Sequence, residues 1–158
     1  MPPWSHLHPL VIHFPIALLM VAPLLVLLGL LWPRERSGIH ACAGLLLVLG
    51  TVSAFLAVIT GMAVPSPGAP SPALQAALEA HEQLGKWSLL LFGCLSLAFL
   101  LLHGLPRLSR WRISPAWTLA LHLLWLALAA GALLSLTRTG HLGGRLVHEL
   151  GIHGERAH

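Results

Sequence analysis

Long apolar stretches separated by short polar ones dominate the pattern along this chain. A helix that crosses a bilayer needs about 20 mostly apolar residues, and four stretches satisfy this: 9–32, 39–62, 72–104 and 115–137. Residues 138–158 follow them as a short tail, expected to lie at the membrane interface. The pattern predicts an all-α protein, a single integral membrane four-helix bundle over residues 1–158.

Prolines and serines mark several of the expected helix ends. Pro9 and Pro115 stand at helix-start positions, where the missing N–H costs nothing, and Ser114 precedes the latter as an N-cap. The third helix starts at Pro72 with amphipathic turns ahead of its apolar part. Pro15 lies inside the first helix and is expected to kink it.

The charged residues support the membrane assignment and predict the orientation of the chain in the membrane. Charged residues make up only 9% of the chain, against about 25% in soluble domains. The basic residues are scattered between apolar runs and form no basic face, which excludes nucleic acid as a partner. Arginine-rich loops stay in the cytoplasm, and the first and third loops hold Arg34, Arg36, Arg107, Arg110 and Arg112. Both termini are therefore predicted to be outside.

Histidine is the most frequent residue type with candidate chemistry, with eleven copies. An imidazole inside a membrane costs free energy unless it is paired or coordinated, so such residues are functional candidates. The predicted outer side holds His6, His8, His13, His81, His141, His148 and His153. The inner half holds His40, His103 and His122.

His13 and His81 are the leading candidates for axial ligands of a haem iron. His81 lies on the apolar face of its helix, with Gly85 one turn further along, which leaves room for a flat macrocycle. His13 lies just before Pro15, where freed carbonyls can hold its other ring N–H. The two come from different helices at one level, as bis-histidine ligation requires. The alternative is a structural histidine bonded to a carbonyl.

The second-rank candidates at the outer side are His8, His141 and His148. His8 is also expected as an N-cap of the first helix. His141 and His148 share a face if the tail is helical, with Arg145 between them to meet haem propionates or lipid phosphate. The alternative for the tail histidines is solvation at the interface.

The inner histidines are candidates for a separate second site. His122 is roughly 12 Å deep in its helix at 1.5 Å per residue, too deep for its ring to reach the surface. His40 or His103 would be its partner, although their expected depths do not match that of His122. The alternative for these two is ordinary polarity at the membrane interface.

The string His8-Pro-Leu-Val-Ile-His13-Phe-Pro-Ile resembles the opening H-P-x-x-V-H-F-P-I of an uncharacterised bacterial membrane-domain family. That family has four predicted helices and unknown function. His81 and the tail segment 143–147 also resemble it, whereas His148 replaces a common tyrosine. Family members occur fused to Rieske-type or cytochrome c domains. The resemblance implies an electron-transfer chain of the bacterial inner membrane, with periplasmic termini here.

The leading functional hypothesis is a b-type cytochrome-like subunit with one or two haem b (heme b) groups. Such a subunit carries electrons and is not itself catalytic. Quinone, membrane lipid and a Rieske protein or cytochrome c are the expected partners, within a larger complex or homo-oligomer. The chain offers no nucleophile–base pair for catalysis.

Two alternatives to this functional hypothesis stay open. One is a copper- or zinc-binding membrane protein, because neutral imidazoles suit both metals. The other is a cofactor-free anchor subunit of a redox complex.

Overall fold

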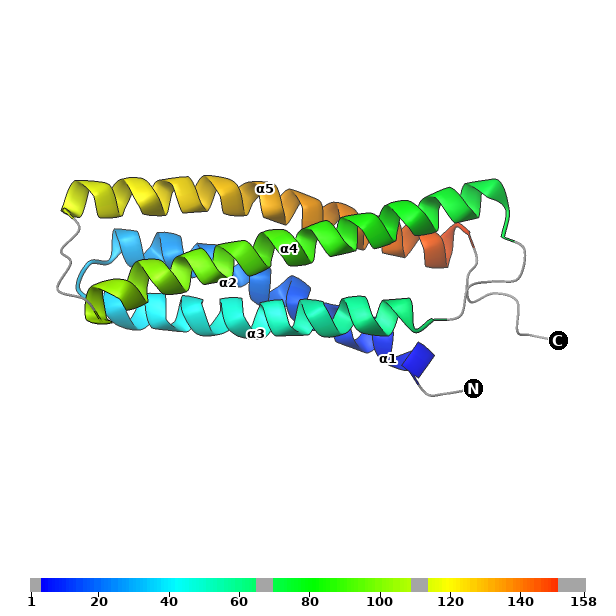
Figure 1. Cartoon of the computed structure of the whole chain (residues 1–158), viewed down its shortest axis with the longest axis horizontal. Helices are drawn as coiled ribbons and strands as arrows, with labels where there is room; N and C mark the ends of the chain where they lie inside the picture. The colour runs from blue at the N-terminus through cyan, green and yellow to red at the C-terminus, as the bar shows by residue number, and fades with distance from the viewer. Residues whose placement is uncertain (1–3, 65–69, 109–113, 151–158) are drawn as a thin grey trace.

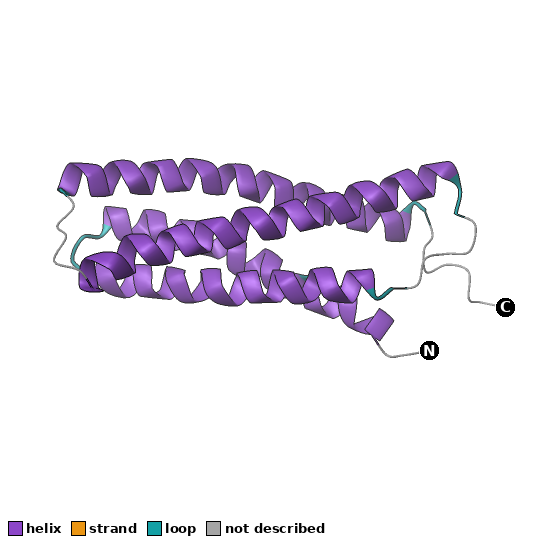
Figure 2. Cartoon of the chain, in the orientation of Figure 1, coloured by secondary structure: helices purple, strands orange, loops and turns teal. Residues whose placement is uncertain are grey.

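The computed structural model describes residues 4–64, 70–108 and 114–150. This described part is helical apart from short turns and contains no strand (Figure 2). The helices are α1 (Trp4–Val11), α2 (His13–Leu31), α3 (Arg36–Met62), α4 (Pro72–Leu108) and α5 (Pro115–His148). The predicted all-α class is confirmed.

The four long helices run up and down as an antiparallel bundle (Figure 1). In it α2 packs on α3, α3 on α4, α4 on α5, and α5 back on α2, while α1 prolongs α2 and packs on α3. The start of α1 and the end of α5 therefore lie at the same end, which we call the terminal end. The opposite end, with the α2–α3 turn and the start of α5, is the distal end.

Each long helix carries a segment that is long and apolar enough to cross a membrane. These segments are His8–Leu31, Arg36–Met62, Pro72–Gly104 and Pro115–His148. Large apolar side chains such as Leu24, Leu45, Leu97 and Leu128 are exposed on the outside of the bundle. An exposed apolar surface of this extent suits lipid rather than water. The protein is a multi-pass membrane protein.

The bundle centre is filled by large side chains that face small residues. Leu19, Leu47, Phe92 and Phe99 are fully buried. A Cβ atom added at Gly50 of α3 would lie 2.6 Å from Leu19 Cδ2 of α2. Glycine at this position therefore lets the two helices approach closely, as small residues do in membrane bundles.

The helix ends agree with the prediction in part. Ser114 caps α5 by accepting from the N–H of Trp117, and the helix interruption at Ile12 lies one turn before Pro15. All four helices extend beyond an expected end. The first begins at Trp4, so Pro9 lies inside α1 and not at a helix start, contrary to prediction. The helix α3 begins at residue 36 rather than 39, and α4 continues to 108 rather than 104. The helix α5 continues to 148, so residues 138–148 prolong it instead of starting a separate tail.

Candidate metal centre

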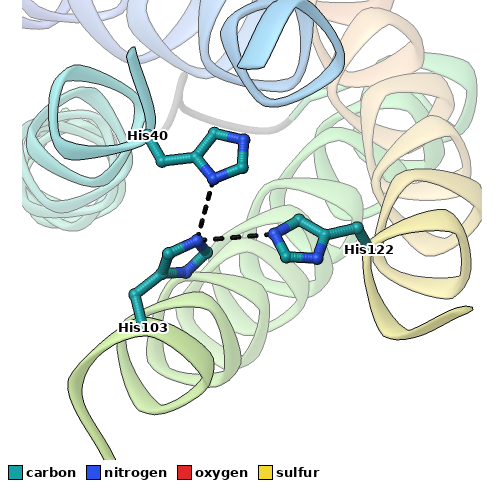
Figure 3. Close-up of side chains that lie close together, drawn as sticks. All are labelled: His40, His103 and His122. Carbon is teal, nitrogen blue, oxygen red and sulfur yellow. Dashed lines mark hydrogen bonds between the residues drawn. The ribbon is translucent and has the colours of Figure 1, made fainter. Parts of the chain in front are cut away.

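Three histidines from three helices meet at the distal end of the bundle (Figure 3). His40 of α3 has its Nδ1 atom 2.9 Å from Nε2 of His103 in α4. The same His103 atom lies 3.4 Å from Nε2 of His122 in α5. The ligand atoms of the three rings all lie within 4.8 Å of one another. His40 and His122 are only 3% and 2% exposed, and His103 is half-buried.

The longer helices explain why these side chains meet. Because α3 begins at Arg36 and α4 continues to Leu108, His40 and His103 each lie about one turn inside their helices. His122 lies about two turns inside α5. The expectation that the three depths do not match was wrong, because the three rings meet although the residues lie at different distances from the ends of their helices.

Each ring also faces a backbone carbonyl with its other nitrogen. His40 Nε2–H donates to the Val26 carbonyl at 3.2 Å. His103 Nδ1–H donates to Phe99 at 2.9 Å, and His122 Nδ1–H donates to Thr118 at 2.7 Å, each one turn earlier in the same helix. A carbonyl only accepts, so these bonds use the single N–H of each neutral ring. When all three rings are neutral, the nitrogens that point toward one another therefore carry lone pairs.

Facing lone pairs determine what the cluster can hold. The lone pairs of His40 Nδ1 and His103 Nε2 repel at 2.9 Å unless a proton or a metal ion binds there. Histidines that ligate metals commonly donate their other N–H to a carbonyl or carboxylate, as these rings do. Zn–N bonds of 2.0–2.1 Å put tetrahedral nitrogen ligands about 3.3 Å apart. Two of the three separations, 2.9 and 3.4 Å, lie around that value, and all three lie within 4.8 Å.

A glycine of α2 provides the space for His40. A Cβ atom added at Gly29 would overlap the imidazole ring of His40. The Gly29 carbonyl accepts a hydrogen bond from Arg36 Nε at 3.1 Å, which holds a guanidinium beside the cluster. Gly29 therefore positions both a candidate ligand, His40, and the guanidinium of Arg36.

Aromatic rings close the cluster on the side of the bundle centre. The Phe99 ring centroid lies 4.2 Å from that of His103 and 5.9 Å from that of His40. Trp125 follows at 5.3 Å from Phe99, and its Nε1–H donates to the Leu95 carbonyl at 2.9 Å. We call Phe99 and Trp125 the aromatic floor of the site.

At the terminal end, His81 is half-buried between α4 and α5. Its Nδ1–H donates to the Thr139 carbonyl at 3.0 Å. A Cβ atom added at Gly143 would lie 3.0 Å from the His81 ring, whereas one at Gly85 would make only an ordinary contact of 3.8 Å with Thr139. The glycine that packs directly against this imidazole is thus Gly143, and the role of Gly85 beside a macrocycle stays a prediction.

His8 is half-buried against α3. The Thr60 hydroxyl donates to the Leu56 carbonyl at 2.8 Å, so its oxygen accepts from His8 Nδ1–H at 3.2 Å. A Cβ atom at Gly61 would lie 3.0 Å from this ring. Because α1 begins at Trp4, His8 lies within the helix and is not its N-cap, contrary to prediction.

The remaining outer candidates lie on the surface. His13, His141 and His148 are exposed. His13 donates from Nδ1 to the Pro9 carbonyl at 2.7 Å, and Arg145 pairs with Glu149 at 2.8 Å. His153 lies outside the described residues. Within the described ranges, three candidate metal ligands come together only in the distal cluster. The inner histidines, which the sequence favoured less than the outer ones, are therefore the histidines that lie close together.

The fold and this cluster together define a class: a four-helix membrane bundle with three histidines gathered in its interior. The chain belongs to the family described as Predicted membrane protein (DUF2231), which it matches over residues 5–156. This match confirms the resemblance to an uncharacterised membrane-domain family. Searches of curated proteins and of solved structures gave no match.

Proposed function

We propose that this protein binds one transition-metal ion in the membrane, through His40, His103 and His122 at the distal end. The observation that carries the proposal is the set of ring nitrogens that face one another with lone pairs, while the opposite N–H groups donate to carbonyls. A bound cation replaces the repulsion between these lone pairs with coordination bonds. Imidazole ligands suit copper and zinc.

Burial supports a metal ion as the cation. His40 and His122 are almost fully buried, and a lone charged imidazole in such a place is costly. A metal ion shares its charge among three ligands that are already oriented. Three protein ligands also leave a coordination position for water or a further group, as in catalytic zinc sites.

Metal content of the purified protein tests this proposal. The full chain in mild detergent, loaded with zinc or copper and desalted, should hold about one ion per chain. The His122→Ala variant should bind the ion about tenfold or more weakly, because it loses one of three ligands. His141→Ala, which removes an exposed imidazole, is the matched control. Equal metal content in wild type and His122→Ala would refute the site.

A second candidate function, haem binding at the terminal end, is favoured by the state of His8 and His81. Both rings donate a hydrogen bond from Nδ1. In a neutral ring this leaves a lone pair on Nε2, which can bind a haem iron. Both also pack against a glycine of a neighbouring helix, Gly61 and Gly143. In this proposal the protein is a b-type cytochrome-like subunit of the bacterial inner membrane. It passes electrons from quinone or membrane partners to a Rieske protein or cytochrome c.

Visible spectra test the haem proposal separately. Reduced-minus-oxidised difference spectra of the protein from haem-sufficient cells should show sharp α and β bands typical of bis-histidine haem. His81→Ala should remove these bands, because the iron loses an axial ligand. His148→Ala, at an exposed position of α5, should keep them. A colourless wild-type preparation rejects haem and leaves the distal metal site as the function.

A further inference from the structure

Positive charge outweighs negative charge in the sequence around the two helix connections of the distal end. The chain contains five acidic residues, and only Glu35 belongs to the segments at the distal end. It is exposed in the turn before α3. The same segments hold five arginines in the sequence, at positions 34, 36, 107, 110 and 112. The cluster itself consists of imidazoles alone, without a carboxylate or thiolate among its members.

Among the arginines whose side chains the structure describes, Arg36 is held beside the cluster by packing. It precedes His40 by four residues on α3, which places both on one face of the helix. Its Nε–H donates to Gly29, the residue on which the His40 ring packs. A bound metal ion would therefore meet a guanidinium whose position is fixed by a hydrogen bond.

Electrostatics at such a site depend steeply on the charge of the ion. The cost of taking an ion out of water grows with the square of its charge, and its repulsion by Arg36 grows in proportion to that charge. Three neutral imidazoles supply no compensating negative charge. A divalent ion keeps two uncompensated charges at this site unless a hydroxide or another anion takes its open position, whereas a monovalent ion that is satisfied by three nitrogens keeps one.

We propose that the distal site selects Cu(I) over divalent ions. In this proposal His40, His103 and His122 bind Cu(I) as three neutral nitrogen ligands. The positive charge of Arg36 disfavours the binding of ions with a higher charge. This inference rests on the proposed metal-binding function and names the ion that the site takes. Cu(I) accepts three-coordinate geometry, and copper is well suited to imidazole.

Competition titrations of the full chain in detergent test the selectivity. Cu(I) is measured anaerobically against bicinchoninate, and Zn(II) against a chromogenic zinc chelator, in buffer without chloride or phosphate. We expect Cu(I) to bind about tenfold or more tightly than Zn(II), because the higher charge of zinc is not compensated. Tighter binding of Zn(II) than of Cu(I) through His122 would overturn the inference and leave the metal site intact. Failure of both ions to bind would instead overturn the proposed function.

Neutralising Arg36 gives a second, quantitative test. Because the Coulomb energy is proportional to the charge of the ion, Arg36→Gln should raise Zn(II) affinity by about the square of the factor by which it raises Cu(I) affinity. Arg36→Lys keeps the charge and should leave the ratio of the two affinities at the wild-type value. Arg34→Gln removes the same charge from an exposed position of the turn and should have a smaller effect. Equal gains for both ions in Arg36→Gln would overturn the electrostatic origin of the selectivity.

Discussion

Gly29 and His40 illustrate at the scale of single residues how the distal cluster is held. The glycine has no side chain where the imidazole lies, and the ring is then fixed by its bond to the Val26 carbonyl. The tautomer of His40 therefore depends on a contact between α2 and α3. A sequence shows that histidines are present, but the carbonyl that each ring meets becomes visible only with the packed helices.

Substitution of Gly29 by alanine should displace the His40 ring. The added methyl group overlaps the imidazole, and overpacking of this kind costs about 1–3 kcal/mol. We expect a lower melting temperature and metal affinity reduced about tenfold or more, because the ligand loses both its position and its carbonyl bond. Thermal denaturation in detergent and metal titration measure the two effects.

Gly38→Ala is the matched control for this substitution. Gly38 lies in α3, and a Cβ atom there would have no neighbour within 4 Å. Alanine is favoured over glycine inside a helix by about 0.5–1 kcal/mol, so this variant should keep full metal binding and should not lose stability. Wild-type metal affinity in Gly29→Ala would contradict the role that we give to this glycine.

At the scale of helices, the sequence predicted which segments are helical more accurately than it predicted where each helix begins and ends. Apolar length identified all four long helices, and the Ser114–Pro115 pair placed the start of α5. Gly104 and Pro106 look like stop signals, yet α4 continues to Leu108. The missing turns at the distal end explain why His103 seemed to lie at a helix terminus.

The candidate site depended on how the helices rotate and tilt against one another. The hydrophobic pattern assigns a residue to a helix and to a depth, which was enough to single out His122 as an imidazole deep in the bundle. It does not give the rotation of α3, α4 and α5 about their axes, which brings the three rings together. The sequence favours His13 and His81 because they belong to different helices at one expected level, and a shared level carries no information about the distance between two side chains.

At the scale of the whole molecule, the bundle puts both ends of the described chain on one side, and the arginines predict which side. A C-terminal alkaline phosphatase fusion after residue 158 should be active, and a fusion in the loop after residue 110 should have about a tenth of that activity or less, by the positive-inside rule. Activity on plates and in lysates, normalised to fusion protein on immunoblots, measures this. A highly active fusion at residue 110 would reverse the orientation.

The aromatic floor has a consequence for how an ion reaches and leaves the distal site. Phe99 is 1% exposed and Trp125 5%, and the centre of the bundle beyond them is filled by Leu47, Leu19 and Phe92. Such packing leaves a hydrated ion no passage through the middle of the bundle. If the site holds a metal ion as proposed, exchange would then be confined to the distal face, and the site would equilibrate with one compartment only. The protein would act as a reservoir whose occupancy follows the free ion concentration on that side, and not as a conduit between the two.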